Sequence, residues 1–423
     1  PAAIRAAIRA ADLAGDGRLR VRWDDGEERA FHLCWLRDNC RCERCCSSSG
    51  QKVNRTVDDH TASAVNLISA EVEADALRLR WSDHDQNAAP VEYDSHWLRK
   101  FAYSTPVIED ETAARQARFA MAPRDLSKGD LQQLPQVTLE RISSGDEGVF
   151  EWMSKMNESG FCMVRNCGTE DGTVERVANL IGPVSHTIYG DTFDVKATPK
   201  PINIAYTDSA LEPHMDLAYF ESPPGVQMLH CIRFDSGVRG GDSTLIDGHA
   251  VAEEFQQRHP EAFRTLSQIP ATFQKDHMDR AHPIKMFYQR PHITTNYLDQ
   301  VTAVYWSPPF EGPLRVKEEF VEPYYKAYNA FRAMLLSDEM WDKYGCVFRL
   351  APGDLLVFNN RRMLHGRNAF TSEAGTRHLQ GCYLDVDTYL NKYRVLADRY
   401  DPQAADACLA APGESRFGTS SHR

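Results

Sequence analysis

The chain has 423 residues, of which 42% are hydrophobic, so it can bury a substantial core in two or three domains at most. Its formal net charge of −12 disfavours a nucleic acid or an anionic membrane as the main partner. No stretch approaches the ~18 consecutive apolar residues that cross a membrane.

The N-terminus, PAAIRAAIRAADLAG, is rich in alanine and arginine and lacks the uninterrupted apolar core of a signal peptide. This pattern predicts a short exposed helix, with organelle targeting as the alternative. The eleven cysteines are odd in number and mostly scattered, often in apolar contexts such as FCMV. Such usage favours buried thiols over a disulfide framework, so we expect a reducing compartment, the cytoplasm.

Two similar segments follow near the N-terminus. Residues 19–26 (LRVRWDDG) and 77–84 (LRLRWSDH) alternate apolar and polar side chains, which is the period of a half-buried strand. Each segment passes a polar turn and reaches a Trp-Leu-Arg triplet, at 35–37 and at 97–99. Because one hairpin is too small to be stable alone, the two units together predict a small β-rich domain over residues 1–105.

Residues 106–135 are polar and contain a helical pattern, ETAARQARFA, so we interpret them as a connector. From 136 to 400, short β-type runs bounded by Gly, Pro or Asp alternate with two longer helical stretches. The tail, residues 401–423, is small and polar and is expected to be loosely ordered.

The region 136–400 predicts a jelly-roll barrel with helical buttresses, so the expected fold class is mainly β with helices. The expected strands lie in FCMVRNCG, PGVQMLHCIRF, STLIDG, AVYWSPPF, DLLVFNN and HLQGCYLD. The expected helices lie in HAVAEEFQQRHPEAFRTLSQ and EEFVEPYYKAYNAFRAMLLS.

Three closely spaced thiols follow the first repeat. Cys40, Cys42 and Cys45 form a C-x-C-x-x-C pattern, and thiolates at such spacing suit tetrahedral zinc, which takes four N or S ligands. We expect His84 as the fourth ligand, because it lies in the turn that corresponds to the Asp25-Gly26 turn of the first repeat.

Cys46 and His96 are the rival fourth ligands, although Cys46 adjoins Cys45 and its side chain should diverge. A closed four-ligand Zn(II) site leaves no position for a substrate, so we interpret it as structural. It would staple the two units of a domain with a thin core. Ordinary buried or reactive cysteines are the alternative.

The stretch PHMDLAYFESPPG (213–225) places His214 and Asp216 two residues apart. In a strand, side chains at i and i+2 point to one face, so the pair can hold one metal ion. An isolated His-x-Asp is more often an ordinary surface pair, so a third ligand decides the interpretation.

That third ligand is His365, which follows the buried strand of DLLVFNN and precedes a glycine that permits close backbone approach. Two histidines and one carboxylate form the facial triad of non-haem Fe(II) oxygenases, which leaves open positions for a cosubstrate and O₂. A 2-oxoglutarate-dependent enzyme also needs a cation for the far carboxylate of the keto acid, and arginine binds carboxylates bidentately. Arg377 lies twelve residues beyond His365, and we expect it one hairpin away, on the next strand.

These motifs resemble the γ-butyrobetaine dioxygenase branch of the taurine-dioxygenase-like Fe(II)/2-oxoglutarate oxygenases, together with the trimethyllysine dioxygenases. The similarity runs from WLRDNCRCERC to about residue 398, and the middle cysteine of C-x-C-x-x-C favours the butyrobetaine branch. The resemblance implies a zinc-bearing N-terminal domain, a double-stranded β-helix catalytic domain and a homodimer. The matching pieces are WLRDNC with C-x-C-x-x-C, NIAYT, H-x-D, PPGVQMLHCI, GGDS, PGD with HGR, and RHLQGCYLD.

The resemblance also implies roles for individual residues. Arg377 would anchor 2-oxoglutarate, with Ser243 of GGDS as a weaker candidate contact. Aromatic faces would hold a quaternary ammonium group, which has no ordinary hydrogen bond to donate, through cation–π attraction. The residues that match the substrate pocket of the family are Tyr189, Phe193, Asn203, Tyr206 and Tyr383.

The chain departs from the family at both ends of this pocket. Phe193 stands where the family usually has Trp, and Leu217 stands where the butyrobetaine enzyme has Tyr. Residues 305–307 (YWS) occupy a region that often carries Asn-Asn near the substrate carboxylate. The iron and cosubstrate residues therefore match, while the substrate pocket differs.

We therefore predict a 2-oxoglutarate-dependent dioxygenase that hydroxylates an aliphatic C–H bond of a small trimethylammonium substrate, with γ-butyrobetaine to carnitine as the first choice. O₂ is the other cosubstrate and ascorbate the expected reductant. The alternatives are the same chemistry on trimethyllysine, trimethylaminoethylphosphonate or another betaine, or on a sulfonate, phosphonate or non-quaternary amino acid. The rival outside enzymes is a non-catalytic metal-binding scaffold.

Overall fold

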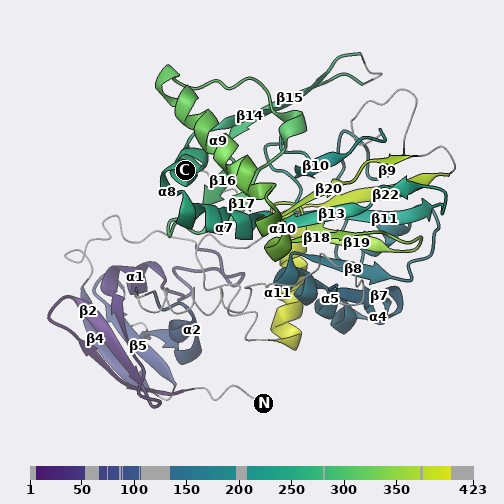
Figure 1. Cartoon of the computed structure of the whole chain (residues 1–423). Coiled ribbons are helices and arrows are strands. Elements are labelled where there is room, and N and C mark those ends of the chain that lie inside the picture. Colours follow the sequence, from purple (N-terminus) through teal and green to yellow (C-terminus); the bar gives the residue numbers. More distant parts are fainter. Residues whose placement is uncertain are drawn as a thin grey trace. The chain divides into compact units, whose positions relative to one another are not determined.

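The computed structural model describes residues 6–52, 66–73, 75–84, 87, 89–103, 105, 134–196, 207–279, 282–371 and 375–401. The chain forms two compact units, Pro1–Ala114 and Arg115–Arg423 (Figure 1). Within the described ranges, every helix is too short or too polar to cross a lipid bilayer.

Each repeat of the N-terminal unit forms a three-stranded antiparallel sheet followed by a short helix, which is one strand more than the predicted hairpin. The Trp-Leu-Arg triplets lie in the helices, where their apolar residues pack into the core of the unit. The first repeat contains β1 (Ile8–Leu13), β2 (Arg18–Trp23), β3 (Glu28–His32) and α1 (Leu33–Asp38). The second contains β4 (Leu67–Glu73), β5 (Ala76–Trp81), β6 (Val91–Asp94) and α2 (Ser95–Lys100).

The helix predicted at the N-terminus is wrong over the residues that form β1. Ile8 is only 3% exposed and pairs with Trp23 of β2, and Ala11 pairs with Val21. Alanine favours a helix, but intrinsic propensity is weak, and the edge of β2 offers backbone hydrogen bonds together with burial of Ile8.

Two ion pairs connect the repeats reciprocally. Arg37 of the first Trp-Leu-Arg triplet binds Asp83 in the turn of the second repeat, with Nη2 at 2.6 Å from Oδ2. Arg99 of the second triplet binds Asp25 in the turn of the first repeat, also at 2.6 Å. The two repeats therefore pack as a pseudo-symmetric pair, each closing the turn of the other.

The second unit is built on two sheets that pack face to face. A six-stranded sheet has the order β7-β8-β19-β11-β22-β9, and a four-stranded sheet has the order β10-β20-β13-β18. Leu229 and Leu356 of the first sheet share a buried apolar cluster with Leu245 of the second. The strands are β7 (Gln136–Thr138), β8 (Phe161–Arg165), β9 (Phe193–Val195), β10 (Leu211–His214), β11 (Val226–Phe234), β13 (Ser243–Asp247), β18 (Gly345–Phe348), β19 (Leu355–Asn359), β20 (Met363–Arg367) and β22 (Arg377–Leu384).

Three strand pairs lie outside these sheets. They are β12 (Arg239–Gly240) with β21 (Phe370–Thr371), β14 (Ala271–His277) with β15 (Ile284–Arg290), and β16 (Ile293–Thr295) with β17 (Val301–Val304). The predicted strands are confirmed except that AVYWSPPF is extended only to Val304 and ends in a 3₁₀ turn, Pro308–Phe310.

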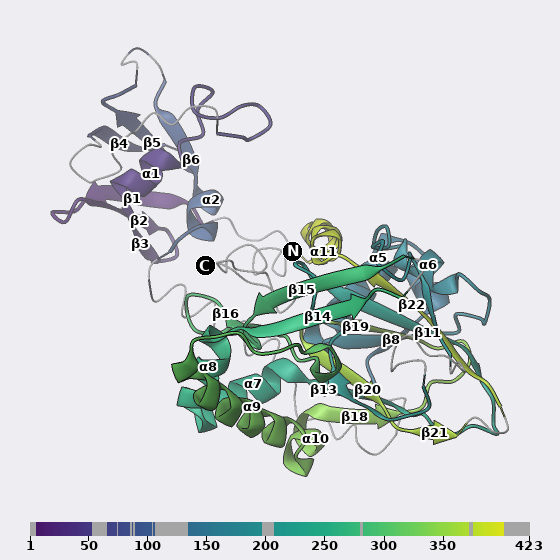
Figure 2. The ribbon, with the colours of Figure 1, turned by 90° about the horizontal axis from the view of Figure 1, so that it is seen from above.

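Helices cover the outer faces of both sheets, on opposite sides of the unit in Figures 1 and 2. The six-stranded sheet is covered by α4 (Leu139–Ser143), α5 (Asp146–Ser159), α6 (Thr173–Ala178) and α11 (Val386–Tyr400). The other side carries α7 (Gly248–Arg258), α8 (Pro260–Gln268), α9 (Val321–Leu335) and α10 (Asp338–Tyr344). The helical stretch predicted over 249–268 is divided at Pro260, which begins α8 because proline suits the first turn of a helix.

Candidate metal-binding active site

The described residues contain two groups of metal-ligating side chains, one in each unit. In each group the ligand atoms all lie within 4.8 Å of one another. The groups are Cys40, Cys42, Cys45 and His84 in the N-terminal unit, and His214, Asp216 and His365 in the second unit.

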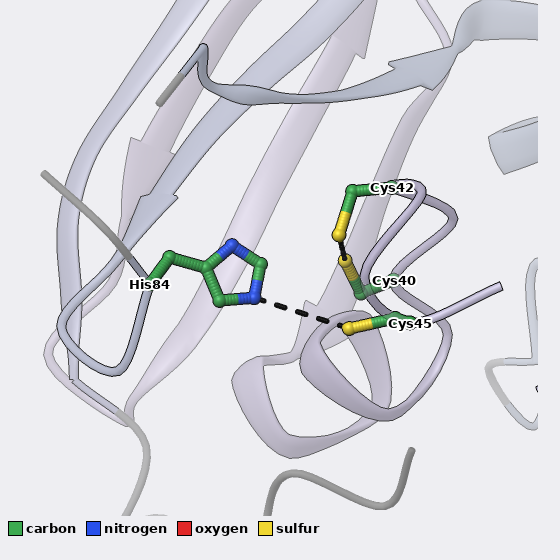
Figure 3. A group of neighbouring side chains, drawn as sticks. All are labelled: Cys40, Cys42, Cys45 and His84. Carbon is green, nitrogen blue, oxygen red and sulfur yellow. Dashed lines mark hydrogen bonds between the residues drawn. The ribbon is translucent and has the colours of Figure 1, made fainter. Parts of the chain in front are cut away.

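The thiol group combines the loop after α1 with the turn after β5 (Figure 3). The Sγ atoms of Cys40 and Cys42 are 3.4 Å apart, and Nε2 of His84 lies 4.0 Å from Sγ of Cys45. Arg37 donates to the same sulfur at 3.5 Å while it binds Asp83, next to His84. The ion pair between the repeats therefore brings His84 to the thiols.

The chemistry of this group fits Zn(II). Burial, with the charge of Arg37, lowers the pKa of His84, so its imidazole is neutral and has a lone pair for a metal. Burial would raise the pKa of Cys42, but hydrogen bonding from the Cys40 thiol lowers it overall and favours the thiolate. The rival ligands Cys46 and His96 are outside the group, and Sγ of Cys46 instead donates to the Cys40 carbonyl.

The second group is assembled by strand register. Strand β10 pairs with β20 so that His214 is directly opposite His365, with ring centroids 4.3 Å apart. Asp216 completes the group, with Oδ1 at 3.5 Å from Nε2 of His214 and Oδ2 at 3.9 Å from Nε2 of His365.

The placement of Asp216 on the same strand as His214 was wrong, because β10 ends at His214. The Asp216 backbone is instead held by the side chain of Asn360, which follows β19. The Asn360 carbonyl accepts from the Asp216 N–H at 3.0 Å, and its amide donates to the Asp216 carbonyl at 3.0 Å. These two bonds take the place of strand pairing at a position where the sheet has ended.

The protonation states in this group fit a divalent cation such as Fe(II). Nδ1 of His214 donates to the Glu212 carbonyl at 2.8 Å, so Nε2 is the ring nitrogen that faces Asp216 and the shared centre of the group. Burial and the neighbouring His214 lower the pKa of His365 to about 3, so this imidazole is neutral. Its Nδ1 is buried without a hydrogen-bond partner among the described residues.

Asp216 is an anion in this setting. Burial would raise its pKa, but the two imidazoles and the Tyr383 hydroxyl outweigh burial and hold the pKa well below its usual range. One carboxylate and two imidazoles that converge in this way are the donor set of non-haem iron sites.

A pocket beside the three side chains opens between the two sheets. Gly366 allows the close packing around it, because a Cβ there would lie 2.5 Å from the Leu211 carbonyl oxygen. The pocket is lined by Tyr189, Phe193, Val195, Leu211, His214, Asp216, Leu217, Tyr219, Gln227, Leu229, Ser243, Pro309, Phe310, His365, Gly366, Arg367, Arg377, Leu379 and Tyr383.

Arg377 and Ser243 both line the pocket, but the expected hairpin between His365 and Arg377 was wrong. His365 lies on β20 of the four-stranded sheet and Arg377 on β22 of the six-stranded sheet, with β21 between them in sequence. Arg377 is 5% exposed, and its Nε donates to the Gly241 carbonyl at 3.2 Å. Burial lowers its pKa only to about 10, so it remains a cation at neutral pH.

Arg367 is a second pocket cation, which the sequence motifs did not indicate. It lies two residues after His365 on β20. Because side chains at i and i+2 of a strand point to one face, this spacing predicts that Arg367 lies on the same face as His365. Burial lowers its pKa to about 10 as well. Its Nη2 donates to the carbonyls of Thr207 and Ser209 at 2.8 and 2.6 Å.

The aromatic residues expected around the substrate are only partly described. Phe193 stacks on Tyr383 with ring centroids 5.0 Å apart, and Tyr189 lies 6.2 Å from Phe193. Asn203 and Tyr206 lie outside the described residues.

The structure adds two aromatic residues to this wall, Tyr219 and Phe310, whose rings meet edge to face at 5.3 Å. Leu217 also lines the pocket, with a left-handed backbone at φ 60°. Residues 305–307, which occupy the region where the resemblance implies Asn-Asn, are buried and do not line the pocket. Ser307 Oγ donates instead to the Met215 carbonyl at 3.0 Å. The sequence offered no signal that Phe310 would face the pocket in place of these residues.

Glu311, next to Phe310, predicts a pH dependence of stability. Burial raises its pKa from 4.5 to about 7, and the hydrogen bond with the Tyr328 hydroxyl offsets this only in part. The folded protein therefore binds this proton more tightly than the unfolded chain. The resulting stability is fully present below pH 4.5 and is lost as the pH rises to about 7.

Glu311→Gln is expected to flatten this dependence and to raise the melting temperature above pH 7, measured by thermal unfolding across the range. The matched control is Glu322→Gln, an exposed carboxylate on α9, which should leave the dependence as it is. An unaltered slope in Glu311→Gln would contradict the prediction.

Comparison with known proteins gives two family matches. The model of the taurine catabolism dioxygenase TauD, TfdA family matches residues 124–383. The model described as gamma-butyrobetaine hydroxylase-like, N-terminal, matches residues 13–99. The two matches fall on different parts of the chain and together span most of it.

Several curated proteins are similar over most of their length. Gamma-butyrobetaine dioxygenase of Homo sapiens is 29% identical over 395 residues, 92% of this chain and 97% of that protein. The Pseudomonas sp. (strain AK-1) protein of the same name is 30% identical over 379 residues, 89% of this chain and 93% of that protein. Mitochondrial trimethyllysine dioxygenase of Rattus norvegicus is 29% identical over 384 residues, 86% and 82% of the two chains. The PvcB protein from Pseudomonas aeruginosa, a solved structure, aligns at 14% identity over 63% of this chain and 94% of that chain, with a TM-score of 0.43.

Proposed function

This chain belongs to the taurine catabolism dioxygenase TauD, TfdA family, and we propose that it is an Fe(II)- and 2-oxoglutarate-dependent dioxygenase that hydroxylates a small trimethylammonium compound. The observation that carries the proposal is the convergence of His214, Asp216 and His365 beside a pocket that also contains Arg377. We assign the three converging residues as iron ligands. Iron bound there would supply the chemistry that couples oxidative decarboxylation of 2-oxoglutarate to hydroxylation of a C–H bond by O₂.

The protein's own residues bind and orient the reactants. Arg377 supplies a buried cation for the far carboxylate of 2-oxoglutarate, and Ser243, which also lines the pocket, is the second proposed contact. Tyr189, Phe193 and Tyr383 present aromatic faces to the quaternary ammonium group, worth up to about 2 kcal/mol or more when desolvated. Such positioning decides which C–H bond reacts.

We propose γ-butyrobetaine as the substrate and carnitine as the product, because several of the similar curated proteins are named gamma-butyrobetaine dioxygenase. Asn203 and Tyr206 complete the proposed substrate contacts. Trimethyllysine, trimethylaminoethylphosphonate or another betaine is the alternative, since Leu217 and Phe310 give the pocket wall an apolar character.

The deciding experiment measures succinate formation by the Fe(II)-loaded protein with 2-oxoglutarate and ascorbate, against a panel of γ-butyrobetaine, trimethyllysine, trimethylaminoethylphosphonate, other betaines and taurine. Stimulation by γ-butyrobetaine, but not by its uncharged carbon isostere, would support the proposal. Turnover that no trimethylammonium compound stimulates would reject the substrate class and keep the oxygenase. A protein that consumes no 2-oxoglutarate under any condition would favour the metal-binding scaffold.

Arg377→Ala is expected to raise the 2-oxoglutarate concentration needed for half-maximal turnover while Fe(II) binding is preserved. The reason is that a neutral side chain cannot pair with the far carboxylate of the keto acid. The measurement is the KM for 2-oxoglutarate at saturating substrate. Arg233→Ala, an exposed arginine at the end of β11, is the control and should leave this KM unaltered. An equal KM in both variants would remove Arg377 from this role.

In the N-terminal unit we propose a structural Zn(II) site formed by Cys40, Cys42, Cys45 and His84. Cys42→Ser and His84→Ala are each expected to lose bound zinc and to lower the melting temperature, because metal binding contributes directly to folding. Zinc is quantified by mass spectrometry of the purified protein. The rival ligands provide controls, since Cys46→Ser and His96→Ala should retain zinc. If His96→Ala loses zinc and His84→Ala retains it, His96 is the fourth ligand instead of His84.

The proposal extends to the fold, the domain limits, the oligomeric state and the compartment. The two packed sheets form the double-stranded β-helix of the catalytic domain, which we place at 136–400 after the N-terminal domain at 1–105 and the connector at 106–135. The tail is 401–423. We also propose that the protein is a homodimer and that it is cytoplasmic. Light scattering coupled to size-exclusion chromatography tests the homodimer.

A further inference from the structure

One oxygen of the proposed iron ligand Asp216 is occupied by two protein donors. Nε2 of Gln227 donates to Oδ2 at 2.7 Å, and the hydroxyl of Tyr383 donates to the same atom at 2.8 Å. The other oxygen, Oδ1, faces His214 at 3.5 Å from Nε2. The two ends of this carboxylate are therefore chemically different before any ligand is present.

The two donors come from neighbouring positions in the six-stranded sheet. Gln227 on β11 and Tyr383 on β22 are direct partners in the antiparallel register, so their side chains leave the same face of the sheet. Asp216 lies outside this sheet, in the segment that follows β10. The contact therefore joins the triad to the facing sheet.

Gln227 is poorly explained as a packing residue. It is 1% exposed, within a run of apolar residues on β11, and its Oε1 is buried without a hydrogen-bond partner among the described residues. A buried acceptor left unpaired costs folding free energy, whereas a leucine at this position would not. The amide therefore serves through its Nε2 atom, whose acceptor is Asp216. Tyr383 has an additional role, since its ring stacks on Phe193 in the pocket wall.

We infer that Gln227 is a positioning residue that, together with Tyr383, reserves Oδ2 of Asp216 and leaves Oδ1 to the metal. A carboxylate can ligate through one oxygen or through both, and a hydrogen bond to one oxygen favours the one-oxygen mode. Outer partners of this kind orient metal ligands and typically contribute about 10- to 100-fold in metal affinity or activity. This inference rests on the proposed function, because it requires a metal at the triad.

The test compares Gln227→Leu with a matched control, Gln380→Leu. Gln380 is also a buried glutamine of the same sheet whose Nε2 donates to an aspartate, Asp171, but it does not line the pocket. Co(II) alone is titrated without oxygen into each protein in its zinc-loaded, iron-free form, so that the thiol group is already occupied, and the visible absorption of Co(II), which depends on coordination number, is recorded. Tyr383→Phe, which removes the other donor and keeps the ring, is measured in parallel.

The expected result is that Gln227→Leu binds Co(II) about 10- to 100-fold more weakly and with an altered spectrum, while its melting temperature in the zinc-loaded, iron-free form is no lower than that of Gln380→Leu. The Gln380→Leu variant should bind Co(II) like the unaltered protein. Unaltered affinity and spectrum in Gln227→Leu would overturn the inference and leave the proposed function standing. Equal losses in both glutamine variants would also overturn it, because they would indicate a general packing defect. If His214→Ala binds Co(II) as tightly as the unaltered protein, the metal is not held by the triad. That result would reject the proposed function.

Discussion

The His214→Ala variant is expected to lose Fe(II) binding and succinate formation together. His214 and His365 face each other across β10 and β20, and the tautomer of His214 is held by its bond to the Glu212 carbonyl. Altering a residue that only hydrogen-bonds to a metal ligand typically lowers metal affinity or activity by about 10- to 100-fold. Removing one of the three proposed ligands should lower metal affinity by more than this. The measurement is iron content after anaerobic reconstitution, followed by succinate formation in the same preparation.

A buried histidine outside the site provides the control for this experiment. His230 on β11 is fully buried, and its Nε2 pairs with the Gly168 carbonyl at 2.9 Å, away from the pocket. His230→Ala is expected to lower stability and to retain iron and turnover. Substantial turnover in His214→Ala would remove this residue from the triad, and loss of iron in both variants would point to misfolding.

The largest expected effect on stability comes from Arg362→Met. Arg362 and Asp247 form an ion pair at 2.7 Å in which the two side chains are 1% and 2% exposed. Asp247 also caps α7, because its Oδ1 accepts from the backbone N–H groups of His249 and Ala250. Removing the arginine leaves a buried carboxylate without its cation, which costs about 3–5 kcal/mol in the free energy of unfolding. The variant should also loosen β20, which carries His365 three residues later.

Chemical denaturation followed by circular dichroism measures this loss. In the double variant Arg362→Met/Asp247→Asn, the uncompensated charge is removed while the helix cap is kept, so much of the stability should return. The exposed pair of Arg233 and Asp235 gives the contrast, since Arg233→Met should alter the free energy of unfolding by less than about 1 kcal/mol. A similar small effect in Arg362→Met would show that the buried pair contributes little.

Residue type and spacing were sufficient to predict that these three side chains lie together. His-x-Asp and a distant His-Gly are short signals whose chemistry is specific in combination, and the structure brings His214, Asp216 and His365 together. This combination of residues does not depend on the local backbone. It therefore identified the three side chains even though the strand expected at Asp216 was wrong. Asp216 lies beyond β10 and is held by Asn360, a contact across 144 residues that no local pattern encodes.

The features that escaped prediction depend on long-range packing. The alanine-rich segment at β1 favours a helix by propensity, and only its pairing with β2 makes it a strand. Sheet order separates β20 from β22, although the two are near in sequence. Gln227 is a single polar residue in an apolar run, and its importance is visible only when its partner is known.

The reciprocal ion pairs give the N-terminal unit two equivalent seams between its repeats. Each seam is closed by an arginine from one repeat and an aspartate from the other, at Arg37–Asp83 and at Arg99–Asp25. Only the first seam carries the thiol and imidazole group, because Gly26 follows Asp25 where His84 follows Asp83. The two halves thus resemble the protomers of a dimer whose symmetry is broken on one side by the group of Cys40, Cys42, Cys45 and His84. If the proposed Zn(II) binds there, its removal would leave one ion pair on each side, so the Asp83 side would lose a cross-link that the Asp25 side never has.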